Sequence, residues 1–113
     1  MVVYLANAFS LSMLPATSKE MIIKIRTLSV TEVKEILSQE EFVSAIGHET
    51  TASYLSKLLG QEIPTRRIQI TLKPGDSLMV FQLMQRLPEG KVLTEEELSR
   101  IPYQFYLVHV VTA

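Results

Sequence analysis

The order of β-prone and helix-prone segments most constrains what this chain can fold into. Stretches rich in β-branched and aromatic residues predict strands at residues 2–6, 21–28, 67–72, 77–84 and 103–111. Amphipathic segments lie between them, and their helices are expected to begin at Ser29 or Thr31, at Thr50 or Thr51, and at Thr94. Each helix must bury its apolar face, so the sequence predicts an α/β fold. We expect a single small domain over residues 1–113, with a mixed central sheet of about five strands flanked by helices.

Local patterns refine two parts of this prediction. Residues 67–72 alternate polar and apolar side chains, and the turn-forming sequence Lys73-Pro74-Gly75-Asp76 follows them, so we expect a hairpin between 67–72 and 77–84. Thr94 is followed three residues later by Glu97, the spacing of a capping box.

Composition excludes several classes of protein. The chain has 47% hydrophobic residues and no Cys, so it is not disordered, and it has no disulfide, thiolate metal site or cysteine nucleophile. A net charge of -1 argues against binding to duplex nucleic acid. No apolar run reaches the roughly twenty residues of a membrane span, and the N-terminal segment lacks the basic flank of a signal peptide. We therefore expect a cytoplasmic protein, in the host cytoplasm if it is viral, whose apolar surplus leaves surface for self-association.

Only two histidines are present, and their settings differ. His109 alternates with apolar neighbours in the last predicted strand, which favours a structural role. His48 follows a glycine at the start of a predicted helix, where backbone N–H groups favour anions. There it can donate a proton to a bound phosphodiester, or it is simply a residue at the start of a helix.

Other chemistry has little support in the sequence. Asp76 is the only Asp and lies in a predicted turn, no histidine pair has helical spacing, and no serine has the glycine pattern of a nucleophile elbow. We therefore expect no metal and no cofactor. Arg66 and Arg67 form a basic pair that is either a solvated strand end or a phosphate contact.

Polar residues also gather where one predicted strand ends. The strand that contains Gln82 runs into Arg86, and a Pro-Glu-Gly turn with Glu89 follows, which is a common way to build a site on a sheet. The alternative is that Arg86 and Glu89 pair across the turn. Asn7 and Ser10 pose the same choice, because they either form a turn or donate to a ligand.

Three segments in a fixed order carry a family resemblance. They are Tyr4-Leu5-Ala6-Asn7-Ala8-Phe9-Ser10, then Ile46-Gly47-His48-Glu49-Thr50-Thr51, then Gln82 to Lys91 with its ending Arg86-Leu87-Pro88-Glu89-Gly90-Lys91. In this order and spacing the chain resembles, over essentially its whole length, the viral-type ring nucleases, which are anti-CRISPR enzymes that disarm type III CRISPR immunity.

The resemblance implies a homodimer that binds cyclic tetra-adenylate at the dimer interface and cuts it into linear di-adenylates without a metal. It implies that His48 is the general acid and that Arg86 and Glu89 line the scissile phosphate. It also implies that a further group lies near the bound nucleotide, namely Asn7, Ser10, Gly47 and Gln82.

The chemistry of the implied substrate agrees with the residues present. In RNA a ribose 2′-hydroxyl can attack the neighbouring phosphorus when it is held in line, so no nucleophile from the protein is needed. The departing 5′-oxygen needs a proton, which the His48 imidazolium would supply. The alternative is a module that binds a cyclic oligonucleotide, to sequester or sense it, without cleaving it.

Overall fold

The computed structural model describes residues 2–85 and 93–112. Five strands form one sheet in the order β2-β5-β4-β1-β3. The strands are β1 (Val3–Ala6), β2 (Ile22–Leu28), β3 (Phe42–Ser44), β4 (Ser77–Leu83) and β5 (Tyr103–Thr112). The helices are a short 3-10 helix η1 (Leu11–Met13) and the α-helices α1 (Val30–Gln39), α2 (Glu49–Leu59) and α3 (Glu95–Ser99). The predicted α/β fold with a mixed sheet is confirmed.

The sheet combines parallel and antiparallel pairs. β1 lies between β3 and β4 and is parallel to both, whereas β5 lies between β2 and β4 and is antiparallel to both. The carboxyl ends of β1, β3 and β4 therefore open at one edge of the sheet. After β3 the chain crosses through α2 to β4, on the other side of β1.

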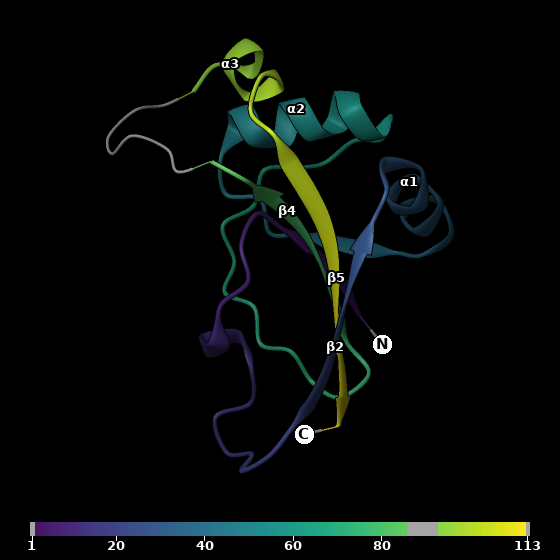
Figure 1. The fold of residues 1–113 in the computed structure, drawn as a ribbon, viewed down its shortest axis with the longest axis vertical. Helices are drawn as coiled ribbons and strands as arrows, with labels where there is room; N and C mark the ends of the chain where they lie inside the picture. Colours follow the sequence, from purple (N-terminus) through teal and green to yellow (C-terminus); the bar gives the residue numbers. More distant parts are fainter. Residues whose placement is uncertain (1, 86–92, 113) are drawn as a thin grey trace.

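Each face of the sheet carries its own core, because side chains alternate along a strand. Met79 and Phe81 of β4 point to the first face, where α1 and α2 cover them with residues such as Leu37 and Leu55. Leu78 and Val80 point to the second face, which no α-helix in the described part of the chain covers. Figure 1 shows α2 and α3 together at one end of the sheet, and the Lys57 Nζ–Glu95 Oε1 ion pair of 3.0 Å joins them.

The second face is covered by irregular chain. Met13 at the end of η1 packs there together with Ile70 and Leu72, which are 4% and 0% exposed. The predicted alternation of burial is present only from Gln69 to Leu72, because Ile68 is 41% exposed, and the predicted strand and hairpin are wrong. The Leu72 N–H donates to the Met13 carbonyl at 2.7 Å, so this segment bonds to the chain after η1 instead of to a strand. Phe42–Ser44 supplies the fifth strand.

Helix starts agree with the sequence in two cases of three. Ser29 and Thr94 each form a capping box, with Glu32 and Glu97 respectively. The expected start of the second helix at Thr50 or Thr51 is wrong, because its N-cap is His48, two or three residues earlier. This places His48 at the boundary between extended and helical backbone.

Two apolar segments are packed within the protomer. Met13 and Leu14 pack against the second core, and β5 has a strand on each side. Among the described residues, no helix is long and apolar enough to cross a membrane.

Candidate functional site

The candidate site lies where the parallel strands end. Asn7 follows β1, Gly47 and His48 follow β3 through a short connection, and Gln85 follows β4. β1 lies between β3 and β4, and the connection after β1 packs on the second face of the sheet whereas α2, after β3, packs on the first. Ligands of open α/β sheets bind at such a point, outside the carboxyl ends of the strands.

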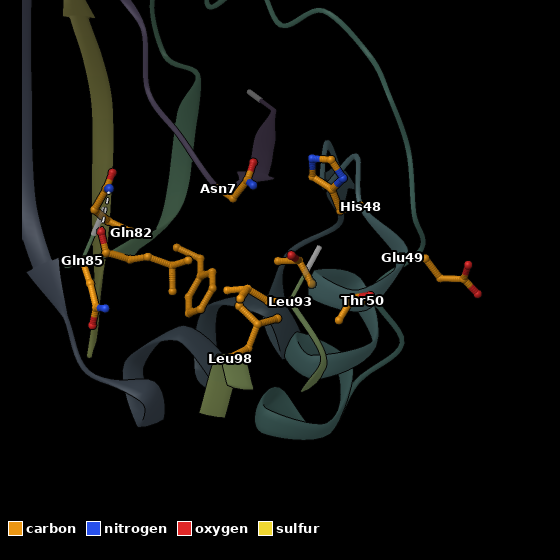
Figure 2. A pocket seen from close by; sticks show the side chains of 11 residues that line it. Asn7, His48, Glu49, Thr50, Gln82, Gln85, Leu93 and Leu98 are labelled. Atoms are coloured by element: carbon orange, nitrogen blue, oxygen red, sulfur yellow. Dashed lines mark hydrogen bonds between the residues drawn. The ribbon is translucent and has the colours of Figure 1, made fainter. Parts of the chain in front are cut away.

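His48 presents an imidazole that makes no hydrogen bond to the described residues at this edge. Its backbone is extended (φ -119°, ψ 127°), its carbonyl accepts from the Ala52 N–H at 3.0 Å, and its side chain makes no capping hydrogen bond. The residue is exposed. Figure 2 shows the ring beside the first turn of α2, whereas the Glu49 carboxylate extends away from the other labelled side chains. The imidazole is therefore free to act on a ligand.

A cavity of about 570 Å³, here called the inner cavity, opens on one side of His48. Phe81, Leu83, Leu93 and Leu98 form its apolar wall, and Figure 2 shows the polar side chains arranged around the same space. The polar lining consists of Asn7, His48, Glu49, Thr50, Thr51, Gln82 and Gln85. An apolar floor with a few carboxamide and hydroxyl groups is typical of a small-molecule site.

A second cavity of about 670 Å³, here called the outer cavity, shares Asn7 and His48 with the first. Met13, Ala45 and Ile70 on its wall belong to the second core, whereas Phe81 and Leu83 of the inner cavity pack with the first core. The two cavities therefore lie toward opposite faces of the sheet. The rest of the outer lining is Ser12, Gly47, Arg67, Ile68 and Gln69.

Two hydrogen bonds at Ser44 hold the chain that leads to His48. Ser44 is 2% exposed, and its hydroxyl donates to the Pro64 carbonyl at 2.6 Å and accepts from the Ile46 N–H at 3.3 Å. The Arg66 N–H continues this pairing with a 2.8 Å bond to the Ile46 carbonyl. Residues 44–47 are thereby fixed against residues 64–67, although neither of the two segments forms a regular ladder there.

Arg67 completes this attachment directly beside His48. Its Nε donates to the Gly47 carbonyl at 3.0 Å, and a Cβ at Gly47 would meet the Arg67 Cγ at 3.1 Å. The remaining guanidinium N–H groups are exposed and line the outer cavity. Absence of a side chain at Gly47 thus lets a cation lie next to the candidate acid.

The structure brings together most of the predicted site. Asn7, Gly47, His48 and Gln82 line the two cavities. Ser10 does not line either one, because it is the N-cap of η1 and its hydroxyl accepts from the Ser12 N–H at 3.1 Å. The two remaining predicted residues, Arg86 and Glu89, lie outside the described residues.

His109 lies away from this edge, near the start of β4. Its Nδ1 is 2.8 Å from the Ser77 hydroxyl, which agrees with the structural role expected of it. Within residues 2–85 and 93–112, no cluster of three or more His, Asp or Glu side chains is arranged to hold a metal.

Sequence reasoning missed part of the lining. Gln85 carries no local signal beyond its place after a predicted strand, and Arg67 is predicted only as half of a basic pair with Arg66. The inward-facing Thr50, Thr51 and Phe81 carry no signal of their own, because hydroxyls at a helix start and an aromatic residue in a strand are common everywhere.

A central mixed sheet with a polar edge at the ends of its parallel strands defines a small α/β protein with a candidate ligand site at that edge. The profile of the family described as STIV B116-like matches residues 3–105, and the chain belongs to this family. The family resemblance stated from the three sequence motifs is thereby confirmed.

Relatives come from viruses and from a bacterium. Uncharacterized protein 26 of Sulfolobus islandicus filamentous virus is 46% identical over 110 residues, which cover 96% of this chain and 92% of that protein. YddF of Bacillus subtilis is 36% identical over 87 residues, which cover 75% and 81% of the two chains. The solved structure of B116 from Sulfolobus turreted icosahedral virus superposes with a TM-score of 0.71 at 29% identity and covers 96% of this chain and 99% of that one.

Proposed function

We propose that this protein is a metal-independent ring nuclease that binds cyclic tetra-adenylate between two copies of the chain and opens it to linear di-adenylates. The proposal depends on one observation above all. A free, exposed imidazole stands with Asn7 on the wall shared by two cavities, at the start of an α-helix. That is a suitable place for a phosphodiester whose two nucleosides extend to either side.

His48 is assigned the role of general acid. The ribose 2′-oxygen forms a bond to the adjacent phosphorus as the bond from phosphorus to the 5′-oxygen breaks, and His48 gives its proton to that 5′-oxygen. The 2′-hydroxyl proton passes to water. The products of each cut are a 2′,3′-cyclic phosphate and a 5′-hydroxyl, so atoms and charge balance without an added nucleophile.

Positive charge for the phosphoryl oxygens comes from arginine. Arg67 already donates one N–H to the Gly47 carbonyl and keeps its other donors toward the outer cavity. Arg86 is assigned the closer contact to the scissile phosphate, with Glu89 beside it, by its place in the family motif. A guanidinium fork suits this task because it contacts two phosphoryl oxygens at once.

Symmetry accounts for the products. A two-fold dimer places one His48 at each of two opposite phosphodiesters of a ring of four equivalent nucleotides. Two cuts release two linear dinucleotides. Cyclic tetra-adenylate is a second messenger of type III CRISPR immunity, so its removal would evade or switch off that signalling.

The test is incubation of the protein with cyclic tetra-adenylate in EDTA, with the products resolved by chromatography. We expect linear di-adenylates, and we expect His48→Ala to lose about 10²–10⁴-fold in rate while it still binds the ring. His109→Gln is the matched control and should retain full activity. Tight binding of an intact ring by the unmodified protein would instead establish the alternative, a module that sequesters the ring.

A further inference from the structure

The two cavities are lined by different chemical groups, so we expect them to bind different parts of a ligand. The inner cavity joins an apolar wall to carboxamides, whereas the outer cavity carries the Arg67 guanidinium. Only Asn7 and His48 line both. A ligand that reaches His48 from both cavities must therefore cross the edge of the sheet from one face to the other.

The inner cavity has the composition of a nucleobase pocket. Phe81 and Leu98 on its wall are held in place by packing, at 1% and 3% exposed, and the half-buried Leu83 and Leu93 supply apolar surface against which a flat aromatic ring can pack. Its volume of about 570 Å³ lies within the range of sites that hold small ligands.

One carboxamide in this cavity is available to read the edge of a base. The Gln82 Nε2 already donates to the Leu83 carbonyl at 3.0 Å. Gln85, in contrast, makes no hydrogen bond within the described part of the chain and is exposed at the mouth of the cavity. A carboxamide can pair with adenine through two bonds, donating to N7 and accepting from the N6 amino group.

We propose that Gln85 is an adenine-specificity residue. On this assignment the inner cavity holds the base on one side of the scissile phosphate, and the neighbouring nucleoside lies in the outer cavity across the edge formed by Asn7 and His48. The inference rests on the proposed function for its substrate class, and it adds which residue reads the base and where the two nucleosides lie. Gln85 is the best choice because it combines location, exposure and an unpaired carboxamide.

Base replacement gives a direct test that needs no cleavage. Hypoxanthine replaces the N6 amino donor of adenine with a carbonyl, so it cannot donate to the Gln85 oxygen. We would measure binding of linear di-adenylate and linear di-inosinate by calorimetry. The unmodified protein should favour di-adenylate by about tenfold or more, since a site built for a hydrogen bond rejects a ligand that lacks it.

Two glutamine variants test which residue discriminates adenine from hypoxanthine. In Gln85→Leu the preference for adenine should fall to within about twofold. Gln39→Leu, a matched change of an exposed glutamine that lines neither cavity, should keep it. Retention of the full preference by Gln85→Leu, or its loss in Gln39→Leu, would overturn the assignment.

Chemical-shift mapping with di-adenylate tests whether the ligand crosses the edge of the sheet and occupies both cavities. Backbone amides of Thr51 in the inner cavity and of Ile68 in the outer cavity should both move on titration. Shifts confined to one cavity would refute the two-sided placement. These outcomes are independent of turnover: an intact ring in the cleavage assay overturns the nuclease proposal alone, and cleavage without base preference overturns only this one.

Discussion

Removal of the Ser44 hydroxyl should destabilise the protein strongly for a change that deletes a single hydroxyl group. The side chain is 2% exposed and serves the Pro64 carbonyl and the Ile46 N–H at 2.6 and 3.3 Å. Ser44→Ala leaves both backbone groups without this partner. Each unsatisfied buried group costs about 1–3 kcal/mol. The short bond belongs at the upper end of that range and the long bond at the lower end, so we expect a total loss of about 2–4 kcal/mol.

The measurement is unfolding in urea and by heat. We expect the urea midpoint to fall at unchanged slope and the Tm to drop by about 8–15 °C, because 1 kcal/mol shifts the Tm of a domain of this length by about 4 °C. Ser38→Ala is the control, since the exposed Ser38 hydroxyl also bonds a backbone carbonyl, that of Glu35 at 2.8 Å. The control should stay within about 0.5 kcal/mol of the unmodified protein. A Ser44→Ala variant as stable as the control would refute the view that this hydroxyl fixes the chain before His48.

Three further predictions concern a helix cap, a tyrosine and the candidate site. The Ser29 backbone and side-chain hydrogen bonds lower the pKa of Glu32, so the stability that they give is present above the ordinary glutamate pKa and is lost as pH falls through the lowered value. Ser29→Ala should cost about 1 kcal/mol near neutrality in denaturant melts, and the difference should shrink in acid. Burial and nearby Tyr103 raise the pKa of Tyr54. The stability that this raised pKa contributes to the fold is present below the ordinary tyrosine pKa and is lost as pH rises toward the raised value. Tyr54→Phe should therefore flatten the alkaline loss of stability in a pH series of melts. Arg86→Lys should reduce ring cleavage by tenfold or more, because an ammonium does not contact two oxygens as the fork does, and near-normal rates would demote Arg86 to a structural partner of Glu89.

Features that depend on a few neighbouring residues could be predicted from the sequence. The capping boxes at Ser29 and Thr94 need only a hydroxyl and a glutamate three residues later, and both are present in the structure. The long strands β2 and β5 carry enough β-branched residues, and β4 enough apolar residues, to be recognised without their partners.

Features that depend on distant partners were missed. Alternation at 67–72 reports which side chains are buried, but a strand also needs a neighbour for its N–H groups, and here Leu72 bonds to Met13, far away in the sequence. β3 has only three residues, and their extended backbone depends on parallel pairing with β1. Neither the absence of a strand at 67–72 nor the presence of β3 can be predicted from the local sequence pattern.

The site shows the same division. His48 could be singled out because a histidine after a glycine at a helix start is a local arrangement. The contact between Arg67 and the Gly47 carbonyl joins residues twenty positions apart, and only the crossing of the two segments creates it. The availability of Gln85 likewise depends on where β4 ends relative to α2 and α3.

The placement of β1 explains how a single imidazole can act on a ligand whose two nucleosides lie in different cavities. The chain that follows β1 runs over the second face through η1, and the chain that follows β3 runs over the first face through α2, so the edge beyond these two parallel strands belongs to both faces of the sheet. Asn7 and His48 occupy that edge, and each cavity opens toward one face. A substitution within one cavity should therefore alter recognition of one nucleoside and leave proton donation intact, whereas a change at His48 should abolish the chemistry for any ligand that still binds. Loss of both properties from a change deep in a single cavity would contradict this separation.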